Sequence, residues 1–226
     1  MSELRVCYGG TFDPVHNGHL AIARDVRDAL QAQVYLLPAA DPPHKDDTHA
    51  DALQRARMLD LAVAGEPGLK VDRRELRREG PSYTVDTLLE LRAELGPQPS
   101  LVWMVGGDSL LKLDTWHRWR ELFELAHVLA VARPGSGLDE QAIAQAAPTV
   151  WAEVGPRWRP AGTLREAPSG GFAVFAPRQE RPESSTQLRQ RIADGGDWQG
   201  WVPPAVAEFI QRHHLYAVRG SATASL

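Results

Sequence analysis

Residues 9–20 read Gly9-Gly10-Thr11-Phe12-Asp13-Pro14-Val15-His16-Asn17-Gly18-His19-Leu20. The apolar residues before this stretch predict a strand at 4–8, and the amphipathic run that begins at Leu20 predicts a helix after it. The loop between them therefore ends at a helix N-terminus, where free backbone amides and the helix dipole favour an anion. Because Gly9 and Gly10 have no Cβ, we expect the main chain to approach that anion closely.

The two histidines of this stretch indicate a site for nucleotide phosphates. His16 and His19 are close to one helical turn apart, so both can face the same anion. The same pair could instead cap the helix, fill a polar gap or chelate a metal ion. A metal site would need further ligands, but no Cys/His cluster supplies them, and the only cysteine, Cys7, lies in the expected strand. We therefore expect no metal held by the protein itself.

The composition predicts one enzyme domain. A chain of 226 residues with 43% hydrophobic residues can bury a full core within a single α/β unit. A formal net charge of -4 argues against a nucleic-acid partner, so any anion site must be local. The single cysteine excludes an internal disulfide and suits a reducing compartment, and the first residues lack the apolar stretch of a signal peptide. No apolar run is long enough for a membrane span, so we expect a cytoplasmic protein, of unassigned oligomeric state.

Strand-like and helix-like segments alternate along the chain. Strands are predicted at residues 4–8, 33–38, 69–73, 100–105, 128–132 and 172–176. Helices are predicted at residues 18–31, 50–64, 84–95, 118–126, 138–147, 185–193 and 203–213. This alternation predicts an α/β fold, a Rossmann-like open parallel sheet with helices on both faces and right-handed crossovers.

The chain shows no internal repeat and is predicted to form one domain over residues 1–217, including C-terminal helices. Residues 134–171 are rich in Pro, Gly and Ala, and we expect them to form a surface excursion with a short helix. Residues 218–226 are small and polar without apolar periodicity, and we expect a flexible tail there.

A second candidate phosphate contact follows the second expected strand, in residues 38–45. In an open parallel sheet, ligands bind where the strands end. Prolines stiffen this loop and present His44 and Lys45, which can both neutralise a phosphate. Taken alone, such a loop is more often a solvated turn in which Lys45 touches nothing.

Residues 9–20 resemble the first signature of the nucleotidylyltransferase superfamily, whose His-x-Gly-His element matches His16-Asn17-Gly18-His19. The second signature, Ser-Ser-Thr-x-Ile-Arg, is similar to Ser184-Ser185-Thr186-Gln187-Leu188-Arg189. Leu188 replaces an isoleucine, and Glu183 stands where the family often has an apolar residue. Two matches in the right order are far more specific than either one. The resemblance implies transfer of a nucleoside monophosphate with release of pyrophosphate.

Further segments resemble the bacterial nicotinate mononucleotide adenylyltransferases of that superfamily. They are Pro43-His44-Lys45, Pro-Ser-Tyr-Thr-Val-Asp-Thr-Leu at 81–88, Gly106-Gly107-Asp108, Trp-His-Arg-Trp at 116–119 and the closing helix at 203–216. Singly, Thr84 and Asp108 could be helix caps, and Trp116 and Trp119 could be core aromatics. Together they imply an enzyme of NAD biosynthesis that transfers the adenylyl group of ATP to nicotinate mononucleotide, giving deamido-NAD and pyrophosphate.

The resemblance also implies roles for particular residues. The implied catalytic residues are His16, His19 and Arg189. The implied ATP-binding residues are Gly9, Gly10, Thr11, Phe12, Gly18, Gly106, Asp108, Ser185 and Thr186. The implied mononucleotide-binding residues are His44, Lys45, Thr84 and Trp116, the last by stacking on the pyridine ring. Mg²⁺ is expected as a partner of ATP, because it keeps most of its waters and prefers phosphate oxygens.

Two other functions stay open at this point. An adenylyltransferase for nicotinamide mononucleotide or pantetheine phosphate would share both signatures, although a pantetheine-phosphate enzyme has no reason to carry residues 81–84 and Trp116. A non-catalytic nucleotide sensor would need affinity alone, and not transition-state groups such as His16 and Arg189.

The helix predicted at 84–95 affects whether the site would prefer nicotinate mononucleotide, an acid, or nicotinamide mononucleotide, the corresponding amide. We expect Thr84 to be its N-cap, so that first-turn amides point toward the mononucleotide. Those donors favour a carboxylate over a neutral carboxamide. Asp86 could occupy the same helix end with its own carboxylate, which would remove the discrimination.

Overall fold

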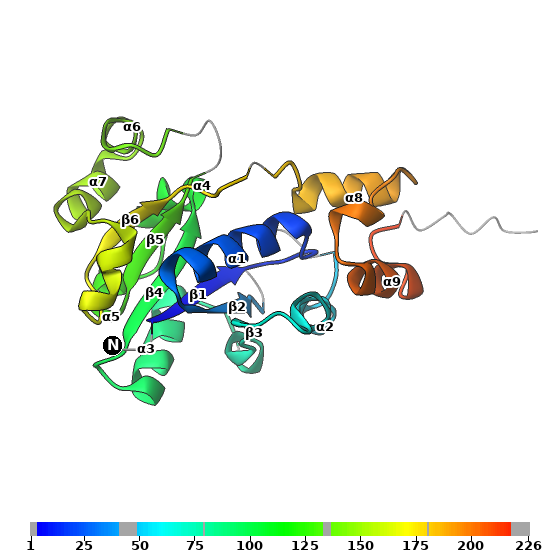
Figure 1. Cartoon of the computed structure of the whole chain (residues 1–226), viewed down its shortest axis with the longest axis horizontal. Coiled ribbons are helices and arrows are strands. Elements are labelled where there is room, and N and C mark those ends of the chain that lie inside the picture. The colour runs from blue at the N-terminus through cyan, green and yellow to red at the C-terminus, as the bar shows by residue number, and fades with distance from the viewer. Residues whose placement is uncertain (1–3, 41–48, 79, 133–136, 180, 218–226) are drawn as a thin grey trace, which may run out of the picture.

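A parallel six-stranded sheet forms the centre of this computed structural model, which describes residues 4–40, 49–78, 80–132, 137–179 and 181–217 (Figure 1). Its strands are β1 (Leu4–Gly10), β2 (Gln33–Pro38), β3 (Leu69–Val71), β4 (Ser100–Gly106), β5 (His127–Val131) and β6 (Phe172–Phe175). Their order across the sheet is β3-β2-β1-β4-β5-β6. This is the strand order of the Rossmann fold, so the predicted fold class is confirmed.

The strand order reverses between β1 and β4. β1 pairs with β2 on one side and with β4 on the other, so Cys7 lies beside both Tyr35 and Trp103. Because all these strands run parallel, their carboxyl ends lie at one edge of the sheet. Gly10 and Gly106 end adjacent strands at that edge. Ligands of open parallel sheets bind at such a switch point.

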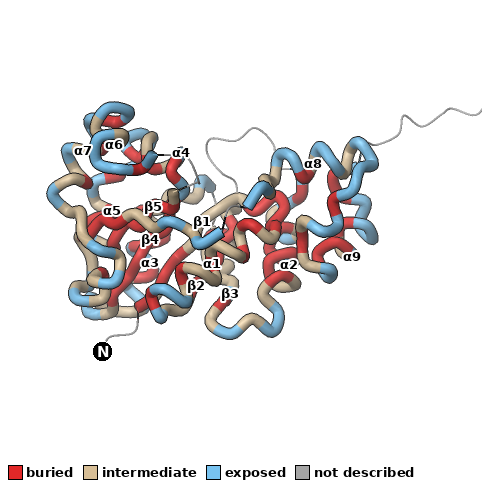
Figure 2. The backbone as a smooth tube through the Cα atoms, turned by 45° about the horizontal axis from the view of Figure 1, so that its top comes forward, coloured by how far each residue is buried: buried red, intermediate tan, exposed pale blue. Residues whose placement is uncertain are grey.

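Helices cover both faces of the sheet. One core cluster includes side chains of α1 (Asn17–Leu30), α2 (Ala52–Val63), α8 (Ser185–Ala193) and α9 (Pro204–Arg212). The other includes side chains of α3 (Thr84–Leu95), α4 (Gly107–Leu110), α5 (Leu122–Leu125), α6 (Glu140–Ala146) and α7 (Pro148–Val154). Successive strand residues alternate between the clusters, with Val6 in the first and Cys7 in the second. Strands β4 and β5 are therefore buried along almost their whole length (Figure 2).

Short 3₁₀ helices connect several elements. They are η1 (Arg74–Arg77), η2 (Leu113–Thr115), η3 (Trp119–Glu121), η4 (Gly155–Arg157), η5 (Ala161–Glu166) and η6 (Gln199–Trp201). Helices α8 and α9 lie at the end of the molecule away from α6 and α7, beside α1 and α2 (Figure 1). Across the described ranges, no helix is both long and apolar enough to cross a membrane.

Two predicted segments differ from the structure. A single helix over 118–126 is wrong, because Arg118 is left-handed (φ 51°) and the segment begins with the 3₁₀ turn η3 before α5. One short helix within 134–171 is also wrong, because α6 is followed by α7, which Pro148 starts at its first position. Helices α3 and α8 have the predicted bounds. The tail at 218–226 lies outside the described residues.

Candidate active site

The signature stretch lies at the carboxyl edge of the sheet, where the strand order reverses. Gly9 and Gly10 are the last residues of β1, and His16 is the N-cap of α1. On the neighbouring strand, Gly106 ends β4 and is the N-cap of α4, while Asp108 is exposed in the first turn of α4. The fold therefore brings the residues implied for the triphosphate and for adenosine to one edge of the sheet.

Neighbouring aromatic rings lie close to both Gly9 and Gly10. A Cβ on Gly9 would lie 2.6 Å from Trp103 Cζ2, and one on Gly10 would lie 3.0 Å from Phe12 Cζ. Core packing thus excludes a Cβ at Gly9, whereas at Gly10 the tip of the Phe12 ring would have to shift by a few tenths of an ångström. Phe12 is buried with a left-handed backbone (φ 50°), and its ring meets His19 edge to face with centroids 5.0 Å apart. Gly9 therefore makes room for Trp103, and Gly10 makes room for Phe12, whose ring supports His19.

His16 and His19 hold each other in place. His16 Nδ1 accepts a hydrogen bond from the His19 backbone N–H (3.4 Å), and His19 Nδ1 accepts one from the His16 backbone N–H (3.3 Å). The rings stack with centroids 3.7 Å apart, and a Cβ on Gly18 would crowd His16 at 3.0 Å. Because both Nδ1 atoms accept, each neutral ring carries its proton on Nε2. The pair therefore caps α1 and also presents oriented Nε2–H donors.

Helix α8 brings the second signature to the first. Ser185 Oγ donates to the carbonyl of Pro14 (3.0 Å), and Arg189 Nη1 donates to the carbonyl of Asp13 (2.7 Å). Thr186 is exposed in the first turn of the helix. The two motifs, which the sequence associates only through their resemblance to a family, are thus joined by hydrogen bonds between residues 171 and 176 positions apart.

Asp13 is a buried carboxylate within the first signature. It is 5% exposed, and it accepts hydrogen bonds from the backbone N–H groups of His49 (2.9 Å) and Ala50 (3.2 Å). These contacts fasten residues 11–16, the signature loop between β1 and α1, to the start of α2. The N-cap of α2 is Asp51. The signal was present in the sequence, since Asp13 is the single acidic residue of residues 9–20.

His44 and Lys45 lie outside the described residues. The nearest described residues on either side, Ala40 and His49, are both held to the signature loop. Arg55, fully buried in α2, donates to the carbonyls of Thr11 and Ala40, each at 2.7 Å, and the Asp13 contacts hold the other side. A charged residue on the buried face of an amphipathic helix is the sequence signal that could have identified Arg55.

The N-cap predicted for the third helix is wrong by one residue. Helix α3 begins at Thr84, and its N-cap is Tyr83, whose side chain makes no capping hydrogen bond. The first-turn N–H groups therefore gain no acceptor from the cap. Asp86 in that turn lies 3.9 Å from Arg118 Nη1, so its charge faces a cation. Trp116 is half-buried in the same core cluster as Tyr83.

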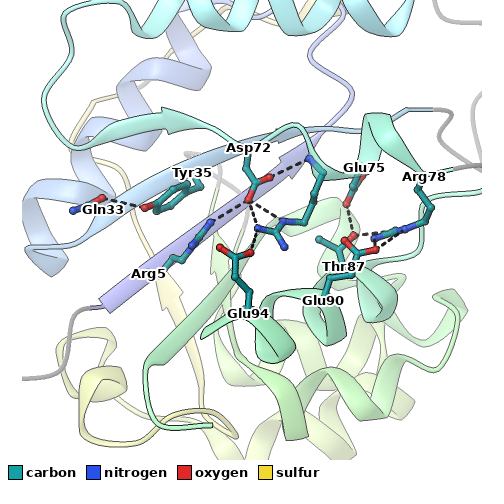
Figure 3. A network of polar contacts seen from close by, with 10 residues as sticks. Arg5, Gln33, Tyr35, Asp72, Glu75, Arg78, Thr87, Glu90 and Glu94 are labelled. Carbon is teal, nitrogen blue, oxygen red and sulfur yellow. Dashed lines mark hydrogen bonds and ion pairs between the residues drawn. The ribbon is translucent and has the colours of Figure 1, made fainter. Parts of the chain in front are cut away.

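A polar network fastens α3 to the sheet and to the segment after β3 (Figure 3). Arg5 Nη2 of β1 donates to Asp72 Oδ2 (3.0 Å). Arg74 in η1 lies between two carboxylates, with Nη2 2.8 Å from Asp72 Oδ2 and 2.8 Å from Glu94 Oε2 of α3. The first strand, η1 and α3 are thus cross-linked by paired charges.

Glu75 is the buried acid of this network. It is 5% exposed, and Thr87 Oγ1 of α3 donates to its Oε1 (2.8 Å) (Figure 3). Arg78 donates to Thr87 Oγ1 (3.2 Å) and to Glu90 Oε1. Burial raises the pKa of Glu75 to about 7 from its ordinary 4.5, against the opposing effects of the Thr87 hydrogen bond and of Arg78. Glu75 therefore sits near half-protonation at neutral pH, under the first turns of α3.

Glu75→Gln is expected to stabilise the protein increasingly as the pH rises from 5 to 8. Between pH 4.5 and 7, the unfolded glutamate has lost its proton while the folded one keeps it, so wild-type stability falls as the pH rises. The glutamine keeps an acceptor for Thr87 and has no charge to bury, so its advantage should grow by about 2 kcal/mol over this range. Urea denaturation at both pH values measures it. Exposed Glu90→Gln is the control, and an equal gain there would contradict burial as the cause.

Comparisons with known proteins agree with this geometry. The family model described as cytidylyltransferase-like matches residues 7–191. A protein of Stenotrophomonas maltophilia (strain K279a), described as a probable nicotinate-nucleotide adenylyltransferase, is 49% identical over 225 residues, covering 96% of this chain and 98% of its own. A relative from Laribacter hongkongensis (strain HLHK9) with the same description is 46% identical over 210 residues, 92% of each chain.

Solved structures share the fold. The Plasmodium falciparum nicotinic acid mononucleotide adenylyltransferase complexed with NaAD matches with a TM-score of 0.71, covering 95% of this chain and 97% of its own. The same enzyme complexed with APC matches with a TM-score of 0.69. The sequence identities are 16% and 15%, so this likeness concerns the architecture alone.

Proposed function

The chain belongs to the cytidylyltransferase-like family and, within it, to the nicotinate-nucleotide adenylyltransferases, and we propose that it transfers the adenylyl group of ATP to nicotinate mononucleotide. The products are deamido-NAD and pyrophosphate, and the reaction belongs to NAD biosynthesis. The proposal includes one catalytic domain over residues 1–217 and a cytoplasmic location, which the free, buried thiol of Cys7 supports.

One observation carries the proposal: the two signature segments meet through side chain to backbone hydrogen bonds at the switch point of the sheet. Arg189 and Ser185 of α8 donate to consecutive carbonyls of the loop that leads to His16. A loop built only to turn the chain would need no such partner from a helix near the other end. The arrangement supports a site that surrounds a phosphate chain from two sides.

The reaction needs little from a base. The attacking mononucleotide phosphate is already ionised at neutral pH, and its oxygen bonds to the α-phosphorus of ATP as the bond to pyrophosphate breaks. The Nε2–H donors of His16 and His19 stabilise the charge that develops on the transferring group. Arg189 holds the departing pyrophosphate, together with the first-turn amides of Ser185 and Thr186 at the start of α8.

Mg²⁺ is proposed to arrive with ATP. Asp13, the carboxylate within the first signature, is buried and accepts three hydrogen bonds from the protein itself. Within the described ranges, no group of three His, Cys, Asp or Glu side chains could hold a metal ion. Mg²⁺ binds phosphate oxygens in preference and keeps several waters. When bound with ATP, it neutralises part of the charge on the triphosphate.

The enzyme is expected to prefer nicotinate mononucleotide over nicotinamide mononucleotide by at least about tenfold in kcat/KM, or about 1.4 kcal/mol. The first-turn N–H groups of α3 donate no hydrogen bond to the side chain of Tyr83, so they can donate to the nicotinate carboxylate. The carboxamide of nicotinamide mononucleotide would place its own N–H donors against these backbone N–H groups, and both sets of donors would lack acceptors. Asp86 is directed to Arg118, which lessens its competition for this helix end.

Pyrophosphate release with ATP held constant tests both the function and the preference. Nicotinate mononucleotide, nicotinamide mononucleotide and phosphopantetheine are offered as separate acceptors. Equal kcat/KM for the acid and the amide would reject the role of the helix end, and turnover with phosphopantetheine alone would reject the proposed function. A folded protein that binds ATP without releasing pyrophosphate would be a sensor and not an enzyme.

A further inference from the structure

Tyr216, which follows helix α9, reaches the signature loop from the other end of the chain. Its hydroxyl donates to Asp13 Oδ1 (2.7 Å), and its side chain belongs to the core cluster that contains Phe12 and Val15. Burial, together with the Asp13 carboxylate, raises the pKa of Tyr216, so the hydroxyl keeps its proton and acts as the donor. The backbone of Tyr216 is left-handed (φ 65°), a conformation that a bulky residue keeps only where its surroundings hold it.

Asp13 connects this hydroxyl to both signatures. Its carboxylate is shared among Tyr216 and the backbone N–H groups at the start of α2, while its own carbonyl accepts the hydrogen bond from Arg189. His16 lies three residues further along the same loop. The orientation of the Asp13 residue therefore affects where the guanidinium of Arg189 and the ring of His16 lie relative to each other.

We propose that Tyr216 is a positioning residue for adenylyl transfer, acting through Asp13 on Arg189. The two backbone donors hold the Asp13 carboxylate to the start of α2, the His49 ring lies beside it with Nδ1 3.7 Å from Oδ2, and the tyrosine hydroxyl donates to Oδ1. Losing that donor leaves a buried carboxylate less fully satisfied, and the loop must adjust to compensate. Small displacements of a catalytic group are costly, because transfer depends on alignment of the attacking and leaving oxygens.

This inference rests on the proposed function, and it predicts a defined kinetic change. Tyr216→Phe removes one hydroxyl and keeps the ring that fills the core. We expect kcat with ATP and nicotinate mononucleotide to fall about tenfold, while the KM of each substrate changes less than about twofold. Assays are run well below the melting temperature of the variant, with the folded fraction measured by circular dichroism, so that a loss of stability does not appear as a loss of kcat.

Tyr35→Phe is the matched control. Tyr35 OH donates to Gln33 Oε1 (3.2 Å), and both residues belong to β2, a strand that contains neither signature (Figure 3). The same atom is removed from a partly buried tyrosine, so a general effect of losing a hydroxyl would appear in both variants. We expect Tyr35→Phe to keep the wild-type kcat.

A double-mutant cycle with Arg189→Ala separates positioning from general support of the fold. If Tyr216 acts by placing Arg189, then Tyr216→Phe should cost less than about twofold in kcat once Arg189 is absent. An unchanged kcat in Tyr216→Phe, or a full tenfold loss in the Arg189→Ala background, would overturn the inference. Wild-type turnover is measured first, so failure of the proposed function would appear there, as absence of pyrophosphate, and not in the comparison of variants.

Discussion

His19→Ala should lower turnover by about 100- to 10,000-fold while the protein stays folded. In the structure, the His19 ring is fixed by Phe12, by stacking on His16 and by the reciprocal helix cap. Its Nε2–H is therefore preorganised toward the charge that develops at the α-phosphorus, and removing one such donor typically costs this much in kcat. Loss of the cap itself should cost only about 1 kcal/mol of stability. Pyrophosphate release per folded protein measures the effect.

His19→Asn distinguishes catalysis from capping. The asparagine side chain can place an acceptor near the position of Nδ1 and so restore the bond to the His16 backbone, but it has nothing in the place of Nε2. We expect it to recover stability without recovering turnover. His213→Ala, at an exposed histidine after α9, is the control for general loss of an imidazole. Near-normal turnover in either folded His19 variant would show that the histidine pair only caps α1.

Arg189→Ala should lower kcat/KM for ATP by about 100- to 1,000-fold. Arg189 is partly buried, and its Nη1 is fixed on the Asp13 carbonyl (2.7 Å), so the guanidinium is held in one orientation. A fixed guanidinium can bind phosphate oxygens in a bidentate manner and neutralise the charge that builds up on the departing pyrophosphate. Arg189→Lys keeps the charge but not the planar fork, and we expect it to recover only part of the loss.

Arg191→Ala is the matched control for this prediction, because it removes an arginine from the same helix. Arg191 Nη1 donates to the carbonyl of Asp197 (3.1 Å), and its guanidinium lies over the Trp201 ring, so it has a structural environment of its own. We expect turnover near that of the wild type. If Arg191→Ala lost as much activity as Arg189→Ala, the effect would belong to the stability of α8 and not to pyrophosphate binding.

Much of the fold was determined by local sequence patterns. The alternation of strand-like and helix-like periodicity predicted the parallel sheet, and it gave the bounds of α3 and α8 correctly, because periodicity reports which face of each element is buried. The arrangement of glycines and histidines before Leu20 also placed a loop at a helix N-terminus. The pairing of residues 9–20 with residues 184–189 was implied by resemblance, and no local pattern contains it.

The errors occurred where boundaries depend on single residues. Tyr83 rather than Thr84 precedes α3, because which residue becomes the N-cap depends on the backbone angles at the end of the preceding loop. Residues 148–154 form α7, whose first residue, Pro148, is compatible both with a helix breaker and with the first position of a helix. At the start of α3, the packing of the whole chain overrides the local preference of threonine for the N-cap position.

The need for glycine at position 9 follows only from the tertiary structure. Trp103 of β4 leaves no room for a Cβ there, and it belongs to a different strand from Gly9. The tertiary structure also decided that Asp13, Arg55 and Tyr216 form the support of the signature loop, from positions spread over almost the whole chain. The physical reason is the range of the interactions. Periodicity and turn chemistry act between neighbours and can be read from the sequence, whereas a buried carboxylate finds its donors only when distant elements have packed around it.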